Sequence, residues 1–181
     1  DDLNARIGLT RWPEAEPAPG GWVQGAPLEK LRELVDYWRH SYDWRRCEAE
    51  LNGFGSFRTV IDGLGFHVLH ARSPVPGAKP MLITHGWPGS VVEFARLIGP
   101  LTDPAAHGGD PADAFHVIAP SLPGYGFSDK PAETGWGVER IARAWEELMR
   151  RLGYDAWVAQ GGDWGAAVTT QLGHIRAKGL E

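Results

Sequence analysis

The sequence predicts an α/β protein in which a β-hairpin leads into a parallel sheet with crossover helices. From residue 81 onward, short apolar runs typical of strands alternate with stretches whose apolar residues recur at helical spacing. Alternation of this kind produces a parallel sheet with right-handed crossovers. Before it, the runs 57–61 and 66–72 are joined by DGLG, which predicts a hairpin. We expect two parts: an N-terminal segment over residues 1–55, and the α/β core over residues 56–181.

The first 25 residues are expected to be irregular, a meander without long helices or strands. Prolines and glycines interrupt them at Pro13, Pro17, Pro19, Gly20 and Gly21. Two indoles, Trp12 and Trp22, also lie here, and large aromatic rings are costly to leave in water. We therefore expect this segment to lie against another part of the protein.

An amphipathic helix is predicted next, in PLEKLRELVDYWRHSYDW, where Pro27 suits a first helical turn. The stretch NGFGS, residues 52–56, ends the helical region. Cys47 falls within the helical region, and we expect its thiol to be structural and partly buried. The residues of the apolar helix face are Leu28, Leu31, Leu34, Val35, Trp38 and Tyr42.

The core elements follow in order. MLITHG is predicted to form a buried strand, and a capping-box pattern, Ser90 with Glu93, opens a helix that reaches about Leu101. FHVIAPS is the next strand, and the long stretch 122–137 is irregular. An amphipathic helix starting at Val138 is ended by Gly153. AWVAQ is the fifth strand, and the chain then turns directly into a last helix.

Composition excludes several classes of protein. With 43% hydrophobic and 23% charged residues among 181, the chain is not a disordered one. The net charge is −5 and no basic run occurs, which argues against nucleic acid or an anionic membrane as the main partner. A single cysteine allows neither an internal disulfide nor a multi-cysteine zinc site. We see no membrane segment and no signal peptide, so we expect a cytoplasmic protein, although a chain that begins with Asp1 can lack its true start.

The sharpest motif is Gly-Gly-Asp-Trp-Gly at residues 161–165, between a predicted strand and a predicted helix. This context is typical of a nucleophile elbow, with Asp163 in the place of serine. The five residues alone also fit an aspartate that merely caps a helix. Residues 108–112, Gly-Gly-Asp-Pro-Ala, nearly repeat the pattern, but no strand precedes them, so we assign them to a loop.

A second motif, His85 to Ser90 (HGWPGS), follows the first strand of the parallel sheet. In an α/β-hydrolase, the loop at this point supplies one backbone N–H of the oxyanion hole, and the residue after the nucleophile supplies the other. Here these donors are the N–H groups of Trp87 and Trp164. By itself the motif also fits an ordinary strand-to-helix turn with a buried His85. Because both motifs follow strands in the expected order, we favour the functional interpretation.

The chain resembles epoxide hydrolases of the α/β-hydrolase superfamily, in the microsomal and juvenile-hormone branch with its bacterial relatives, which carries an N-terminal wrapping segment. The resemblance covers nearly the whole chain. It rests on RWPEAE, WVQG and LVDYWRHSYDWR in the N-terminal segment, and on FRTVIDGLGFHVLHARS, HGWPGSVVEF, APSLPGYGFSDKP and GWGVERIARAWEELMRRLGY with QGGDWG in the core.

The resemblance implies the N-terminal part of an α/β-hydrolase fold and a two-step hydrolysis. Asp163 attacks an epoxide carbon to form an ester, which water then cleaves while Trp87 and Trp164 stabilise the developing charge. The partners are a small epoxide and water, the product is a vicinal diol, and no cofactor or metal is expected. Detoxification or aromatic hydrocarbon catabolism would be the setting.

The same resemblance places a general-base histidine, its orienting acid and cap tyrosines after the elbow. His174 is the one later histidine, and we expect it on the surface of the elbow helix; Tyr125 and Tyr154 precede Asp163 and are expected to pack. We therefore expect an incomplete chain that does not turn over. We also expect its strand ending at Gln160 to become an exposed, aggregation-prone edge.

Two other functions remain open. A haloalkane or haloacid dehalogenase shares the Asp nucleophile, although its oxyanion loop often carries a halide-binding Asn where this chain has Trp87. A non-catalytic member of the fold could use the N-terminal meander for binding. A serine esterase is disfavoured because Ser56 and Ser128 lie outside any G-x-S-x-G, and no nucleotide-binding glycine motif occurs.

Overall fold

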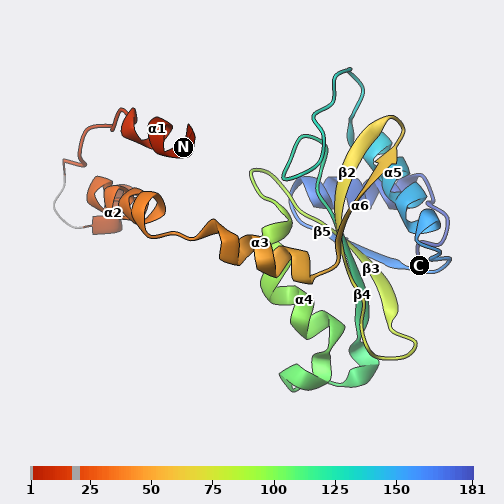
Figure 1. Cartoon of the computed structure of the whole chain (residues 1–181). Helices are drawn as coiled ribbons and strands as arrows, with labels where there is room; N and C mark the ends of the chain where they lie inside the picture. The colour runs from red at the N-terminus through yellow and green to blue at the C-terminus, as the bar shows by residue number, and fades with distance from the viewer. Residues whose placement is uncertain (1, 18–20) are drawn as a thin grey trace. The chain divides into compact units, whose positions relative to one another are not determined.

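The computed structural model describes residues 2–17 and 21–181, which divide into two compact units, Asp1–Cys47 and Glu48–Glu181 (Figure 1). This division falls inside helix α3 (Trp44–Gly53). The sequence-based division after residue 55 stays a prediction. Pro19 and Gly20, which we expected to interrupt regular structure, lie outside the described residues.

The first unit is more helical than its sequence indicated. It contains α1 (Asp2–Gly8), the 3-10 turn η1 (Gly21–Gln24) and α2 (Leu28–His40). The expectation of irregular structure is wrong for α1, because no proline or glycine occurs before Gly8, and Arg6 pairs with Asp2 one turn earlier at 3.0 Å. Residues 10–17 are irregular, as predicted.

The predicted helix in the first unit is broken into two. α2 ends at His40, and α3 starts at Trp44, so Tyr42 lies between the helices. The break is local: the Asp43 carboxylate accepts the Arg45 backbone N–H at 2.9 Å and so favours a new helix start over continuation. Cys47 is a free, partly buried thiol in α3, as expected.

The two indoles of the meander differ in their surroundings. The Arg32 guanidinium of α2 lies 5.6 Å from the centre of the Trp12 ring, a cation–π contact. Trp22 is 69% exposed.

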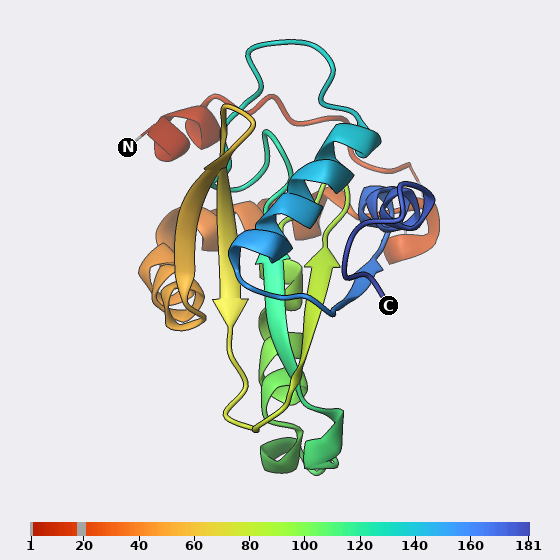
Figure 2. The same ribbon diagram turned by 90° about the vertical axis from the view of Figure 1, so that its right-hand side faces the viewer.

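The second unit is built on a five-stranded sheet with the order β1-β2-β4-β3-β5 (Figure 2). Asp62 and Gly63 join the first two strands, both with positive φ (51° and 77°), as a two-residue hairpin turn demands. β4 is antiparallel to β2 and parallel to β3, which is in turn parallel to β5. The strands are β1 (Ser56–Ile61), β2 (Leu64–Ala71), β3 (Lys79–Thr84), β4 (Phe115–Pro120) and β5 (Val158–Gly161).

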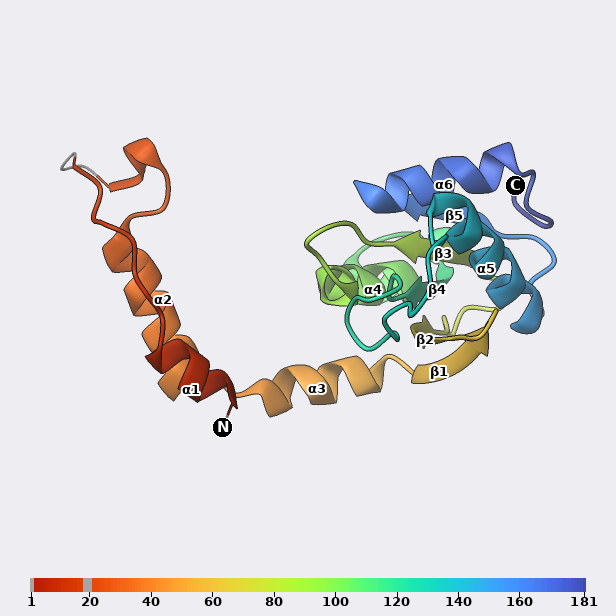
Figure 3. The same cartoon turned by 90° about the horizontal axis from the view of Figure 1, so that it is seen from above.

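The predicted parallel sheet is thus confirmed, and its three parallel strands end at one edge. Seen from above, the strands succeed one another from β5 to β1 across the unit (Figure 3). Among the described strands β5 forms one edge of the sheet and β1 the other. Just before β5, Trp157 pairs in parallel with Leu180, and the Trp157 N–H donates to Gly179 O at 2.8 Å.

The helices cover both faces of this sheet, with α5 (Val138–Arg151) and α6 (Trp164–His174) in front and α4 (Ala95–Thr102) behind in Figure 2. The predicted capping box is present, because Ser90 Oγ accepts the Val92 N–H and the Glu93 carboxylate accepts the Ser90 N–H at 3.0 Å. It opens a 3-10 turn, η2 (Val91–Phe94), before α4 begins. Two further 3-10 turns, η3 (Pro104–His107) and η4 (Pro111–Asp113), precede β4.

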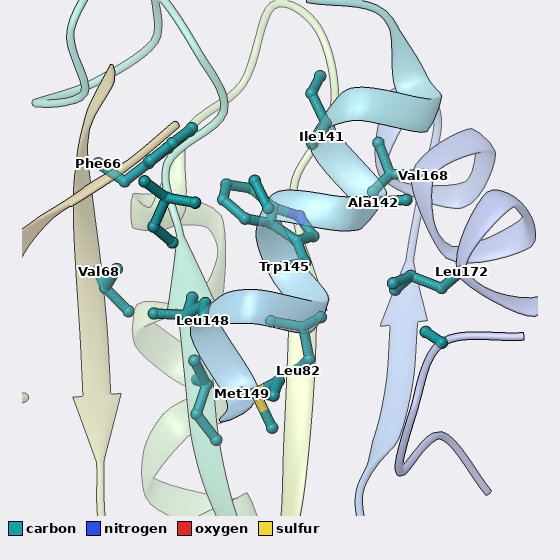
Figure 4. Packing of buried hydrophobic residues seen from close by; sticks show 14 of the residues in the cluster. Phe66, Val68, Leu82, Ile141, Ala142, Trp145, Leu148, Met149, Val168 and Leu172 are labelled. Carbon is teal, nitrogen blue, oxygen red and sulfur yellow. The ribbon is translucent and has the colours of Figure 1, made fainter. Parts of the chain in front are cut away.

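The core lies between α5, α6 and the sheet, and Trp145 is at its centre (Figure 4). This indole is fully buried, and its ring meets Phe66 of β2 edge-on at 5.1 Å between ring centres. The same core includes Val168 and Leu172 of α6. The labelled core residues are Phe66, Val68, Leu82, Ile141, Ala142, Trp145, Leu148, Met149, Val168 and Leu172.

Candidate active site

Asp163 occupies a sharp turn between β5 and α6, as the motif predicted. Its backbone has φ 52° and ψ −123°, a conformation that non-glycine residues rarely adopt and that is typical of strained functional turns. Its carbonyl oxygen accepts the Ala166 N–H at 3.0 Å, but its side chain makes no capping hydrogen bond to the second or third residue of the helix. The interpretation of Asp163 as a mere side-chain cap is therefore wrong.

Three glycines make this turn sterically possible. A Cβ on Gly161 would collide with the backbone carbonyl of Gly165, and one on Gly165 would collide with the carbonyl oxygen of Thr84. A Cβ on Gly86 would lie 2.6 Å from the Cβ of Asp163. The elbow and the loop after β3 thus approach each other more closely than side chains would allow.

The Asp163 carboxylate lies in the site that the sequence assigned to an oxyanion. The backbone N–H of Trp87 donates to Asp163 Oδ1 at 2.8 Å, across 76 residues of sequence. The Trp87 N–H is the main cause that lowers the pKa of Asp163, and the neighbouring Trp164 N–H adds to it, against a weaker opposing effect of desolvation. The carboxylate is therefore held ionised.

A cavity of about 550 Å³ opens at this carboxylate. Sequence reasoning assigned Glu93 only to the capping box, which it does form, but Glu93 also lines this cavity. Only the folded loop brings it there, so no sequence signal marks it. The lining residues are Thr84, His85, Gly86, Trp87, Pro88, Gly89, Glu93, Phe94, Gln160, Gly162 and Asp163.

A second, more apolar cavity of about 300 Å³ begins at the next residue along the chain, Trp164. The irregular stretch after β4 supplies Tyr125 and Trp136, and the two front helices supply Ile141 and Val168. No motif marked this cavity, because most of its wall comes from a stretch without periodicity. Its remaining lining residues are Leu122, Pro123, Pro131, Gly137 and Val138.

The other residues considered from sequence lie away from this chemistry. Asp110, in the near-repeat of the elbow motif, caps η4 through the Ala112 N–H at 2.8 Å, which confirms its place in a loop. His174 is exposed at the end of α6, as expected. Tyr154 packs by stacking on His116 and hydrogen-bonds His70 at 2.8 Å. Ser128 lies in a loop, where its hydroxyl donates to the Ser121 carbonyl at 2.8 Å.

Within residues 2–17 and 21–181, no group of three or more His, Cys, Asp or Glu side chains is arranged to hold a metal ion. None of the helices in this part of the chain combines the length and the apolar character needed to cross a bilayer.

Comparison with known proteins agrees with this geometry. Residues 1–94 match the family model described as Epoxide hydrolase N terminus, and residues 79–176 match the alpha/beta hydrolase fold. A putative epoxide hydrolase from Stigmatella aurantiaca is 64% identical over 99% of this chain and 40% of its own length. Epoxide hydrolase 1 of Oryctolagus cuniculus is 43% identical over 83% of this chain and 34% of its own.

Solved structures give the same result. The juvenile hormone epoxide hydrolase of the silkworm Bombyx mori superposes with a TM-score of 0.83 at 37% identity, covering 99% of this chain and 47% of that one. The Aspergillus niger epoxide hydrolase superposes with a TM-score of 0.78 at 34% identity, covering 98% and 46%. The chain thus spans less than half the length of these relatives. Both halves of its sequence match the same kind of protein, and the chain belongs to the epoxide hydrolase family of the α/β-hydrolase fold.

Proposed function

We propose that these residues carry the nucleophilic half of an epoxide hydrolase site, with Asp163 as the nucleophile and the N–H groups of Trp87 and Trp164 as the oxyanion hole. One observation carries the proposal: the 2.8 Å bond from the Trp87 N–H to Asp163 Oδ1 at an elbow of positive φ. A structural aspartate at a helix start would accept a hydrogen bond from the second or third residue of its helix, whereas Asp163 accepts one from the loop after β3.

In the first step, Oδ2 of Asp163 attacks one epoxide carbon from the side opposite the ring oxygen. A C–O bond forms to the enzyme, the ring C–O bond breaks, and its electron pair stays on the epoxide oxygen, which takes up a proton from water or, by family resemblance, from a cap tyrosine of the whole enzyme. The low pKa of Asp163 keeps the attacking group ionised at neutral pH.

In the second step, water attacks the carbonyl carbon of the Asp163 ester. Negative charge then develops on Oδ1, which the Trp87 N–H already contacts, so the donors need no rearrangement. The ester C–O bond breaks on the acyl side, a vicinal diol leaves, and the carboxylate is restored. By family resemblance, the general base, its acid and the proton-donating tyrosines come from other residues of the whole enzyme. We therefore assign to the described residues the nucleophile and the oxyanion hole.

The substrate we propose is an epoxide with an apolar substituent, for which the cavity beside Trp164 offers Tyr125, Trp136 and Ile141. The proposed setting is cytoplasmic, in the detoxification of epoxides or the breakdown of aromatic hydrocarbons. No metal or cofactor enters either step.

Covalent labelling by styrene oxide tests the proposal. Intact mass spectrometry of the chain is expected to show one adduct, which peptide mapping places on Asp163. Asp163→Asn should reduce labelling to background, because a neutral amide is a poor nucleophile. Asp110→Asn is the matched control, since it alters the near-repeat of the same motif, and it should label like the unaltered chain.

Three results would contradict parts of this proposal. Labelling that survives Asp163→Asn would exclude the assigned nucleophile. Steady diol formation that Asp163→Asn abolishes would show that the chain completes both steps. Release of bromide from 1-bromobutane without any reaction of styrene oxide would favour the dehalogenase alternative.

A further inference from the structure

His85 lies at the end of β3, next to the oxyanion loop, and both of its ring nitrogens are engaged. The side chain is 1% exposed. Nδ1 lies 3.0 Å from the carbonyl oxygen of Gly86, and Nε2 lies 3.0 Å from the backbone N–H of Leu122 in the stretch after β4. Its ring also meets Tyr125 edge-on, 5.6 Å between centres.

These two contacts leave one possible protonation state. A backbone N–H can only donate, so Nε2 must be the acceptor in the bond with Leu122. The ring proton therefore resides on Nδ1, which donates it to the Gly86 oxygen. Burial lowers the pKa of His85 and keeps the ring neutral, while the Gly86 carbonyl and the Glu93 carboxylate, the charged group that faces it, oppose this shift more weakly.

The Gly86 oxygen belongs to the same peptide group as the Trp87 N–H. In a trans peptide the C=O and N–H bonds point in opposite directions from one rigid plane. Two donors hold the oxygen, His85 Nδ1 on one hand and the Gly89 N–H at 3.0 Å on the other. Whatever fixes the direction of this oxygen therefore also fixes the direction of the N–H that reaches Asp163.

We propose that His85 is a positioning residue for the oxyanion hole, acting through the Gly86–Trp87 peptide plane. Its Nδ1–H holds the Gly86 carbonyl so that the Trp87 N–H is aimed at Asp163 Oδ1, and its Nε2 ties this loop to the stretch after β4. The catalytic role of His85 rests on the proposed function, but the alignment of the Trp87 N–H with Asp163 Oδ1 does not.

Two substitutions separate positioning from packing, because each keeps one of the two hydrogen bonds. The amide nitrogen of His85→Asn takes the place of Nδ1 and can still donate to Gly86. The amide oxygen of His85→Gln takes the place of Nε2 and can still accept from Leu122. Each variant loses one buried hydrogen bond, so a merely structural role predicts similar effects.

The first readout is the pKa of the Asp163 carboxyl. It is measured by ¹³C NMR of chain labelled at its aspartates, and the signal of Asp163 is identified by its loss in Asp163→Asn. Loss of an aligned donor destabilises the carboxylate, so His85→Gln should raise this pKa toward that of an ordinary aspartate, whereas His85→Asn should leave it near the unaltered value. Styrene oxide labelling reports the first step alone and should persist in both variants, because the donors act on the charge that develops on Oδ1 in the second step.

Equal effects of the two variants on the Asp163 pKa, or none, would overturn the proposal. ¹⁵N NMR of chain labelled at its histidines tests the proposal without any substitution. A His85 ring that is protonated on Nε2, or doubly protonated at pH 7, would also overturn the proposal. The expected pKa pattern without labelling by styrene oxide would leave the positioning role intact and contradict the proposed function instead.

Discussion

Helices α2 and α5 both carry an apolar stripe at helical spacing, but the two units of the molecule use these stripes differently. In α5 of the second unit, Trp145, Leu148 and Met149 are buried against the sheet and α6. In α2 of the first unit, Leu28 is buried, whereas Leu34 is 62% exposed and Trp38 is 46% exposed. The spacing predicted both helices equally well. What differs is the surface that each stripe contacts within its own unit.

The comparison teaches that periodicity locates a helix face but does not identify its packing partner. For α5 the partner follows from chain order, since a helix between two parallel strands must cover their sheet. No such rule applies to α2, because it does not lie between two strands of the part of the chain that the structure describes. Substitutions in the two stripes therefore test how far the contrast holds in solution.

The largest expected effect is that of Trp145→Ala. Removing a fully buried indole leaves a cavity next to Phe66, and the loss in free energy of unfolding is expected to be about 3–5 kcal/mol. Trp38→Ala, the matched change in α2, should cost about 0.5 kcal/mol or less. Urea unfolding followed by far-ultraviolet circular dichroism measures both.

A loss for Trp38→Ala as large as that for Trp145→Ala would break the comparison, because it would mean that the α2 stripe is covered in solution. A negligible loss for Trp145→Ala would contradict the assignment of the core.

A smaller loss of stability is expected when a methyl group is added where α6 approaches the sheet. Gly165→Ala places a Cβ against the Thr84 carbonyl, which cannot move without the strand, so we expect a loss of about 1–3 kcal/mol. Gly173→Ala is its control on the same helix, where a Cβ meets nothing within 4 Å. It should raise stability by up to about 1 kcal/mol through helix propensity. Thermal unfolding distinguishes the two, and similar effects at both positions would refute the close approach.

The smallest effect concerns the pH dependence of stability. Burial, with Arg72 and His116, lowers the pKa of His70 to about 4. The folded state therefore binds the proton less readily than the unfolded chain, and the stabilisation present above pH 6.5 is lost as the pH falls toward 4. Because His70 is only half-buried, we expect about 1–2 kcal/mol of this loss.

His70→Gln should make that part of the pH profile less steep, measured by urea unfolding between pH 7 and pH 4, while the lowered pKa values of His67, His85 and His116 keep part of the slope. His40→Gln, in the exposed surface of α2, is the control and should leave the unfolding of the second unit unchanged. An unaltered profile in His70→Gln would contradict the assignment.

The sequence predicted the second unit well because its signals were local or followed from topology. The hairpin at Asp62 and Gly63, the capping box and the elbow each have a short signature, and parallel strands bring the loop of Trp87 to Asp163 automatically. The signals failed where neighbouring interactions compete: Asp43 interrupts a helix that the apolar spacing alone would have continued.

Two features of the site had no sequence signature at all. The apolar cavity depends on Trp136, which an irregular stretch brings to the elbow. The protonation state of His85 depends on the Leu122 N–H, which lies 37 residues later in the chain. Both arise from long-range contacts that no local pattern encodes.

The glycines of the elbow have a consequence for how this family is studied by mutagenesis. Gly161 and Gly165 face backbone atoms of α6 and of β3, so any side chain placed there must displace the backbone. A saturation screen scored by activity would rank them with Asp163, as positions where every substitution lowers activity. Intolerance to substitution at this turn therefore does not identify the residue that reacts, and only a covalent product on Asp163 can do so.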